Sequence, residues 1–461
     1  MNILLSRSII VLLTCLLQTI CSFSQFWIGL DEGFGCGTYN VREIAGNSNG
    51  GLATRGGFSF TSECIPTPNI SLWSGSTWES LGCNDGIGGG GNLLWYDSKL
   101  ITTGQQVCGS DTLDCRVLIW DNNEWSSLWI SDEIAQGYDI ISHNSSLYFT
   151  GSYRFIGGES FGMVFKLDGD MIVPLIEESS FSEDSHFGNA LTYYHDTLYV
   201  GGKFAGANQD ERSDNLTAIY DSSIHRVNMG LSYGLGIVES LCVHRDTLFI
   251  GGLFMPDPLL QIEDTTCLLY YDGQHLGSYG VNATDRITCM QSYNDELYIG
   301  GWFESMNDIP CVGVGKLNGH QLSALNTYPF YASDGTQQNP QIFDLEIVND
   351  SVLIAGNFMY IGDSSPLGGV AKLNADITED VQHYDALNKF RLLQNPVSTQ
   401  IDFSIPPTHP VFQARLFDVN GHLLKTVDND NIIDVSHLSS GVYVLMITCK
   451  NYQYSFRVIV L

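Results

Sequence analysis

The chain has 461 residues, of which 44% are hydrophobic and 15% are charged, so it can bury a sizeable core and is not disordered over most of its length. Its 48 glycines and sparse charge are typical of many short strands and tight turns, not of long surface helices. The formal net charge of −31 excludes nucleic acid and anionic lipid as main partners.

The first 24 residues have the pattern of a signal peptide. Arg7 supplies a basic start, residues 9–20 form an apolar run too short for a convincing bilayer span, and Ser22 to Ser24 provide small residues before a cleavage point ahead of Gln25. A signal anchor is the alternative. No later run approaches eighteen apolar residues. We therefore predict an exported protein that is not an integral membrane protein.

Export would leave ten cysteines in an oxidising compartment, where disulfides persist. Cys108 and Cys115 flank the segment GSDTLD, and a disulfide between them would close a small loop. Other candidates stay open because spacing does not fix their connectivity: Cys36, Cys64, Cys83, Cys242, Cys267, Cys289 and Cys311. No cysteine pair has CxxC spacing and no histidines form HxH or HExxH, so the sequence predicts no zinc site.

A segment in which an apolar strand ends in glycine and is followed by an aromatic residue recurs along the chain. The clearest copies are DTLYVGGKF (196–204), DTLFIGGLF (246–254), DELYIGGWF (295–303) and DSVLIAGNF (350–358), with weaker copies at 50–58, 98–106 and 145–153. The first apolar residues of successive copies lie about 50 residues apart: Leu52, Leu100, Leu147, Leu198, Leu248, Leu297 and Val352. A glycine follows each of them by four residues: Gly56, Gly104, Gly151, Gly202, Gly252, Gly301 and Gly356.

Each repeat has room for four short strands. An apolar segment precedes each signature across a turn such as HDT or NDE, and two further strands meet at an Asn-Gly or Asp-Gly turn, as in 266–280 and 311–325. Separate β-sandwich modules would need repeats of roughly a hundred residues. We therefore predict an all-β fold, a seven-bladed β-propeller with four-stranded blades over residues 26–380. The glycines would allow close backbone packing and the aromatics would fill the space between blades.

This pattern resembles the kelch-like propellers, which share the strand ending in Gly-Gly, the following aromatic residue and a later tryptophan in the same blade. The segments LWSGSTW, with Trp73 and Trp78, and IWDNNEW, with Trp120 and Trp125, match the later part. Units four to seven keep the glycines and lose the tryptophan. The resemblance implies a fold and no particular activity.

The chain changes character after a linker at 381–388. Residues 389–461 show alternating strands and an Asn-Gly hairpin turn, which indicate a small β-sandwich. They resemble the C-terminal sorting domain of the type IX secretion system of Bacteroidetes; a generic adhesive sandwich is the alternative. The residues that carry the resemblance are Asn395, Pro396, Asp418, Asn420, Gly421, Leu438, Gly441 and Tyr443.

The resemblance implies transport across the outer membrane by the type IX machinery, with this domain recognised and commonly removed. The product is then released or anchored at the cell surface. The charge agrees with separate modules: the tail holds six Lys/Arg and five Asp/Glu, or +1, and the signal segment adds +1, so the body carries −31 − 1 − 1 = −33.

No catalytic set stands out in the body, and none is assigned. Three loops expected on one face are rich in acids, and their carboxylates are chemically able to bind calcium, the one cofactor that the sequence leaves open; solvated loop charge is the favoured interpretation. These acids are Asp210, Glu211, Asp214, Asp257, Glu263, Asp264, Glu304 and Asp308. His143, His195 and His244 occupy equivalent turns in different units, so we expect structural roles.

The sequence therefore favours a secreted or surface-anchored protein whose propeller loops bind a glycan or a protein. The alternative is an extracellular hydrolase or oxidase that acts on polysaccharide. Glycoside hydrolysis needs two carboxylates at a fixed separation, and the body offers too many acids to choose a pair.

Overall fold

The structure, a computed structural model, describes residues 26–374 and 391–460 with internal gaps. The longest gaps are 35–39, 62–68, 82–86, 131–135, 177–186, 206–212, 232–235, 393–396, 405–411 and 419–422. The signal segment and the linker lie outside the described residues. The chain divides into two compact units, Met1–Ala375 and Asp376–Leu461.

The first unit is built from seven four-stranded antiparallel sheets. In order from the first strand to the outer strand, they are β2 (Val41–Gly46), β3 (Leu52–Gly56), β4 (Ile70–Trp73), β5 (Trp78–Ser80); β7 (Leu93–Tyr96), β8 (Lys99–Thr103), β11 (Cys115–Asp121), β12 (Glu124–Ile130); β13 (Gln136–His143), β14 (Ser146–Ser152), β17 (Val164–Asp168), β18 (Met171–Ile176); β19 (Phe187–Tyr194), β20 (Thr197–Lys203), β21 (Leu216–Tyr220), β22 (Ser223–Arg226); β23 (Gly236–His244), β24 (Thr247–Phe254), β25 (Thr266–Tyr271), β26 (Leu276–Ser278); β27 (Ile287–Tyr293), β28 (Glu296–Gly301), β31 (Val314–Asn318), β32 (Gln321–Ala324); and β35 (Ile342–Val348), β36 (Ser351–Gly356), β38 (Val370–Asn374), β1 (Phe26–Gly29).

Smaller elements decorate these sheets. They are β6 (Ile87–Gly88), β9 (Gln105–Cys108) and β10 (Asp111–Leu113); β15 (Phe155–Ile156) and β16 (Glu159–Ser160); β29 (Ser305–Met306) and β30 (Ile309–Pro310); β33 (Phe330–Tyr331), β34 (Gln337–Gln338) and β37 (Tyr360–Ile361). The one helical element among the described residues is the 3-10 turn Pro258–Leu260. None of the described residues forms a helix with the length and apolarity that a bilayer span requires.

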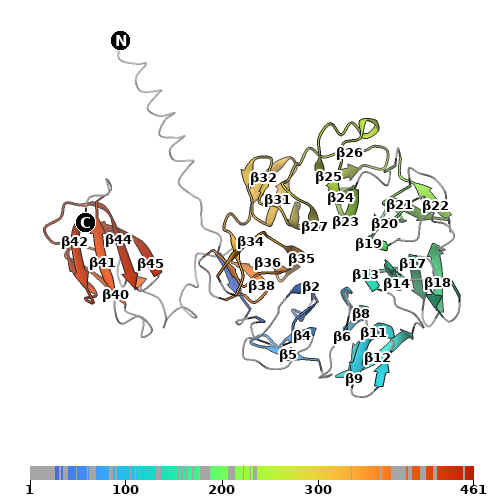
Figure 1. Ribbon diagram of the computed structural model, residues 1–461, viewed down its shortest axis with the longest axis horizontal. Coiled ribbons are helices and arrows are strands. Elements are labelled where there is room, and N and C mark those ends of the chain that lie inside the picture. Colours follow the sequence, from blue (N-terminus) through green and yellow to red (C-terminus); the bar gives the residue numbers. More distant parts are fainter. Residues whose placement is uncertain are drawn as a thin grey trace, which may run out of the picture. The chain divides into compact units, whose positions relative to one another are not determined.

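The seven sheets follow one another in a circuit, with their first strands innermost (Figure 1). Each first strand lies beside the first strand of the next sheet, in the order β2, β7, β13, β19, β23, β27, β35, and β35 lies beside β2 again. No sheet closes on itself. The last sheet takes its outer strand from the other end of the unit, because β1 pairs with β38, Phe26 opposite Asn374.

Tight turns fix the register of the first two strands in most sheets. Both central residues of these turns have positive φ, which a two-residue type I′ hairpin loop requires. The pairs are Asp97-Ser98, Asn144-Ser145, His195-Asp196, Arg245-Asp246, Asn294-Asp295 and Asn349-Asp350. Asn and Asp tolerate this conformation best, which explains the recurrent HDT and NDE segments.

The two glycines of the repeated signature have different neighbours. A Cβ on Gly301 would lie closer than 3.0 Å to the carbonyl oxygen of Arg286, at the start of its own sheet. A Cβ on Gly300 would lie equally close to Cys289 Sγ, and 3.1 Å from Ile342 of the next sheet. The second glycine therefore permits pairing within a sheet, whereas the first permits packing between sheets. An added Cβ would likewise lie closest to a backbone carbonyl oxygen near the start of the same sheet at four equivalent glycines: Gly56, Gly202, Gly252 and Gly356.

The aromatic residue after the glycines is buried in each described copy: Phe58, Phe204, Phe254, Phe303 and Phe358. The tryptophans of the first two units form facing pairs across hairpins, Trp73 with Trp78 and Trp120 with Trp125, with ring centroids 5.2 and 5.1 Å apart.

The second unit contains two sheets that share one core. One sheet has the order β39 (Arg391–Leu392), β40 (Gln400–Ser404), β43 (Ile432–Asp434), and the other β42 (Leu423–Asp428), β41 (Gln413–Phe417), β44 (Gly441–Cys449), β45 (Tyr452–Val460). Ile401 and Phe403 of the first sheet pack with Leu416 and Leu445 of the second in one buried cluster, as in a β-sandwich.

The four cysteines described in full are unpaired: Cys242, Cys267, Cys289 and Cys311. The expectation of disulfides finds no support among them. Cys267, Cys289 and Cys311 are buried, and burial raises the pKa of Cys242, Cys267 and Cys311 to about 12. The side chains of Cys108 and Cys115 lie outside the described residues, so their disulfide stays a prediction.

We expect Gly301→Ala to lower the free energy of unfolding by about 1–3 kcal/mol, because the strand pairing must shift to admit a methyl group. Gly277→Ala is the matched control in a strand, since its nearest atom would lie 3.5 Å from the new Cβ. Chemical denaturation of the three proteins measures the difference. Equal stability of Gly301→Ala and the parent would contradict this account.

We also expect the four unpaired thiols to resist alkylation in the folded protein at pH 8, because the reactive thiolate is suppressed by burial. Alkylation in native buffer and in denaturant, followed by peptide mass mapping, reports each cysteine separately. Rapid native labelling of Cys267, Cys289 or Cys311 would show that the core of these sheets opens easily.

Candidate functional site

The first strands share a local irregularity near their starts. Six of the seven contain a register shift that leaves one residue opposite no partner, a β-bulge. The bulge residues are Arg42, Tyr138, Asn189, Glu239, Thr288 and Phe343. Since the sheets repeat in the same sense, these residues come to the same end of the circuit, which we call the start face. Arg42 is exposed and the other five are half-buried.

Hydrogen bonds from side chains cross from sheet to sheet at this level. Asn92 Nδ2, just before β7, donates to Asp139 Oδ1 of β13 at 3.1 Å. Asp139 Oδ2 accepts the backbone N–H of Leu191 in β19 at 2.7 Å, and its Oδ1 also accepts the N–H of Ile140 at 2.8 Å. One carboxylate therefore links three consecutive sheets.

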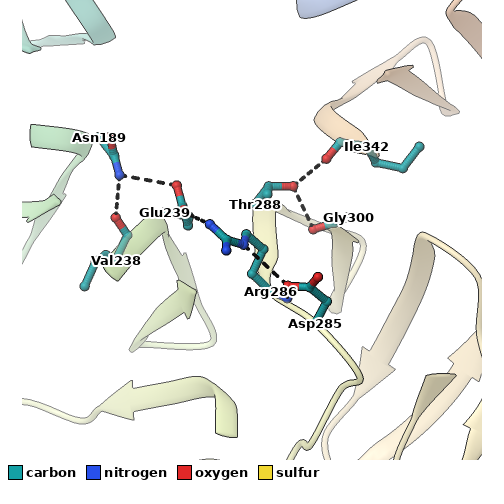
Figure 2. A network of polar contacts seen from close by, with 8 residues as sticks. All are labelled: Asn189, Val238, Glu239, Asp285, Arg286, Thr288, Gly300 and Ile342. Carbon is teal, nitrogen blue, oxygen red and sulfur yellow. Dashed lines mark hydrogen bonds and ion pairs between the residues drawn. The ribbon is translucent and has the colours of Figure 1, made fainter. Parts of the chain in front are cut away.

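Figure 2 shows how the next junctions continue this pattern. Asn189 Nδ2 donates to Val238 O at 3.0 Å and to Glu239 Oε2 at 3.3 Å. From the other side, Arg286 Nη1 donates to Glu239 Oε1 at 3.0 Å, so Glu239 lies between the amide and the guanidinium. Thr288 Oγ1 then donates to Ile342 O at 2.6 Å.

Two further bonds complete the circuit. Asp344 Oδ2 accepts the N–H of Ile44 in β2 at 2.8 Å, in the same way as Asp139 accepts Leu191. Trp95 Nε1 of β7 donates to Ala45 O of β2 at 3.1 Å. Every junction between neighbouring first strands is thus bridged by a side chain, and we call this set the junction bonds.

The carboxylates of the junction bonds are held away from water. Burial raises the pKa of Asp139 to about 7 and that of Asp344 to about 6, although two backbone N–H donors oppose the rise in each case. Burial also raises the pKa of Glu239, against the effect of Arg286. Desolvation affects the pKa values of these three carboxyl groups more than any neighbouring charge does.

Two aromatic rings lie between two arginines on the start face. The Arg286 guanidinium lies 5.1 Å from the Trp302 ring centroid, Trp302 meets Phe343 edge to face at 6.0 Å, and Arg42 lies 5.6 Å from Phe343. We call these four residues the arginine–aromatic row. Trp302 and Phe343 are half-buried, so part of each ring is accessible to a ligand.

The residues expected at the site from sequence are distributed differently. Asp257 is buried and caps the 3-10 turn by accepting the N–H of Leu259 at 2.8 Å. Asp214 is buried too, whereas Glu263, Asp264, Glu304 and Asp308 are exposed on loops. Asp210 and Glu211 lie outside the described residues. Among the described residues, no three His, Cys, Asp or Glu side chains are grouped so that they could hold a metal ion.

The three histidines do not converge. Each contacts the next sheet at a different junction: His143 stacks on Tyr193 at 3.7 Å, His195 Nε2 lies 2.7 Å from Asp246 Oδ1, and His244 Nδ1 lies 2.9 Å from Ser292 Oγ. These contacts lie at the opposite ends of the first strands from the bulges.

Several sorting-signal residues also have described positions. Tyr443 is buried in β44 and its hydroxyl donates to Ser439 O at 2.7 Å, Gly441 begins that strand, and Asp418 follows β41. Asn395, Pro396, Asn420 and Gly421 lie outside the described residues.

Sequence reasoning missed the arginine–aromatic row. The sequence feature that indicates the row is a position that varies between repeats while its neighbours recur in every clear copy. Trp302 stands between the conserved-looking Gly301 and Phe303, where the other clear copies have Lys203, Leu253 and Asn357. The bulge residues likewise differ from repeat to repeat, and none of the bulges was predicted from the sequence.

The junction carboxylates predict a pH dependence of stability. In the unfolded chain Asp139 and Asp344 lose their protons near pH 3.8, whereas the folded protein keeps them until about pH 7 and 6. Unfolding therefore releases protons in this window, and the free energy of unfolding falls as the pH rises from about 4 to 7, by up to about 7 kcal/mol for the two shifts together at about 1.4 kcal/mol per pKa unit.

Denaturation at several pH values measures this slope. We expect the variant Asp139→Asn/Asp344→Asn to be less stable than the parent and to show a flatter slope, while Asp308→Asn, at an exposed turn, keeps the parent's slope. An unchanged slope in the double variant would contradict the role assigned to these carboxylates.

Residues 394–461 match the family described as "Secretion system C-terminal sorting domain". No curated protein matches the chain.

Two of the solved structures to which this chain is similar are extracellular domains of putative component systems from B. thetaiotaomicron. One, assigned to a hybrid two component system, is 9% identical, with a TM-score of 0.45 and coverage of 92% of this chain and 55% of that chain. Another, assigned to a one component system, is 13% identical, with a TM-score of 0.41 and coverage of 95% and 58%. This chain thus spans just over half the length of these proteins. Identities this low do not indicate a shared ligand.

The matched family agrees with the sorting domain expected from the sequence, and such a domain engages the secretion machinery. Residues 394–461 are therefore a type IX secretion sorting domain, and the protein is secreted or attached to the outer-membrane surface.

Proposed function

We propose that the seven sheets are the blades of a seven-bladed β-propeller of kelch-like type. The contacts between successive first strands, the return from β35 to β2, and the equivalent bulges support this architecture. An array of separate sandwich modules would bring neither β2 beside β35 nor β1 into the last sheet.

On this architecture the start face is one mouth of the propeller, and the protein acts as an exported binding protein for a glycan or a protein partner. The observation that carries this proposal is the arginine–aromatic row. Its half-buried rings and charged groups, with Arg42 and Phe343 in strands and Arg286 and Trp302 directly next to strand ends, are the mixture that small-ligand sites use. The sorting domain delivers this surface to the outside of the cell.

The junction carboxylates favour binding over hydrolysis. Both oxygens of Asp139 and of Asp344 already accept backbone N–H groups, which orients them toward neighbouring strands. A general acid or base must instead reach the substrate. One observation favours the alternative hydrolase: the pKa of Asp139, raised to about 7 by burial, lies where acid–base catalysis works well.

Binding of the mature protein to a glycan array, with and without calcium, tests the proposal. We expect Trp302→Ala and Phe343→Ala each to weaken binding of the preferred ligand at least tenfold, about 1.4 kcal/mol, because the stacking surface is lost. Tyr220→Ala is the matched control, since Tyr220 is an exposed aromatic residue in the outer part of its sheet.

Three outcomes would contradict parts of this account. Equal binding by Trp302→Ala and the parent would remove the start face as the site. Binding that depends on calcium would move the site toward the acidic loops. Breakdown of the bound glycan by the parent but not by Asp139→Asn would establish the hydrolase instead.

A further inference from the structure

The two ends of the arginine–aromatic row differ in charge. Arg42 is exposed and forms no ion pair within the described part of the chain; its guanidinium lies over Phe343. Arg286 is neutralised, because Nη1 meets Glu239 at 3.0 Å and Nε meets Asp285 at 3.4 Å. One end of the row is therefore a free cation, and the other end carries an excess of carboxylate.

The acids nearest to Arg42 do not cancel its charge. The two oxygens of Asp344 accept the N–H groups of Leu345 and Ile44, each at 2.8 Å, so they are directed into the sheets. Burial raises the pKa of Asp344 to about 6, and burial with neighbouring acids raises that of Glu43 well above its usual value. The carboxylate oxygens of Asp344 are thus bonded to backbone N–H groups.

Arg42 influences the pKa of a residue in another sheet. Its charge lowers the pKa of Tyr138, against the upward effect of burial, although Tyr138 belongs to the third sheet and Arg42 to the first. Tyr138 in turn lies 5.6 Å from the Phe187 ring of the fourth sheet. The charge of Arg42 therefore reaches an aromatic side chain of another sheet.

Two carboxylates beside the arginine–aromatic row are able to accept hydrogen bonds from hydroxyl groups of a ligand. A carboxylate has about four lone-pair positions, so Glu239 can accept further hydrogen bonds beyond those from Asn189 and Arg286. Its neighbour Asp285 is partly exposed. Carboxylates that accept hydrogen bonds from hydroxyl groups, beside half-buried aromatic rings, suit a sugar. A sugar presents polar edges to the carboxylates and apolar C–H faces to the rings.

We propose that the start face binds a short glycan that bears a carboxylate, with the carboxylate on Arg42, sugar faces on Phe343 and Trp302, and hydroxyls on Glu239. This inference rests on the proposed function and narrows its ligand. A compact anion fits better than a long polyanion, because the acidic body repels extended charge, while a direct contact acts within the Debye length of about 8 Å. Arg is suited to a carboxylate because its planar fork can donate two parallel hydrogen bonds.

An array of paired glycans tests this inference on the mature protein. Each pair contains a uronic-acid-terminated oligosaccharide and the same oligosaccharide with the acid replaced by the neutral hexose, and a second set pairs sialylated glycans with their desialylated forms. We expect the acidic member to bind at least tenfold more tightly. Arg42→Gln should abolish this preference by weakening binding of the acidic member much more than binding of the neutral member, whereas Arg42→Lys should retain part of the preference.

Thermal unfolding of Arg42→Gln checks the fold, which should be unaffected because the residue is exposed. Equal binding of acidic and neutral members, or an unchanged preference in Arg42→Gln, would overturn the inference. If Trp302→Ala still weakened binding in that case, the proposed function would stand without it. If Trp302→Ala and Arg42→Gln both bound every glycan as the parent does, both proposals would fail.

Discussion

The first unit depends on how neighbouring first strands satisfy their polar groups where the sheets meet. A polar side chain buried at such a junction is costly unless it is hydrogen-bonded, and here each junction has at least one bond that reaches into the next sheet. Asp139 links three sheets and Asp344 links two. Because these bonds come from different residue types in different repeats, each junction is specific, and a sheet is matched to its own neighbours.

The β-bulges relate the junction bonds to the proposed binding surface. A residue inserted near the start of a first strand shifts the alternation of its side chains. In β35, for instance, Asp344 is directed into the junction while Phe343 stays half-buried beside Arg42. The same irregularity thus directs Asp344 into the junction and leaves Phe343 half-buried, in a strand, at the proposed binding surface.

Sequence periodicity was sufficient for the all-β class and the four-stranded antiparallel sheets, because glycines, turns and apolar strands recur wherever backbone geometry demands them. The sorting domain was predicted from its resemblance to a known family. The turn pairs such as His195-Asp196 show why: positive φ restricts the residues allowed. The row was not predictable in that way. Arg42, Trp302 and Phe343 occupy positions where the fold tolerates several residue types, so only their proximity across three sheets indicates a site. The roles of Gly300 and Gly301 also needed coordinates, since both look alike in sequence.

The pairing of β1 with β38 has a consequence for how an exported chain acquires its structure. The first and the last of the described strands in this unit belong to one sheet, so that sheet has no complete form while the chain is still emerging from the ribosome. Contacts between residues so far apart in sequence form slowly, because loop closure must precede them. Assembly is therefore delayed until both ends are present in the same compartment, and a chain held back at its leading end would stay open along its last sheet.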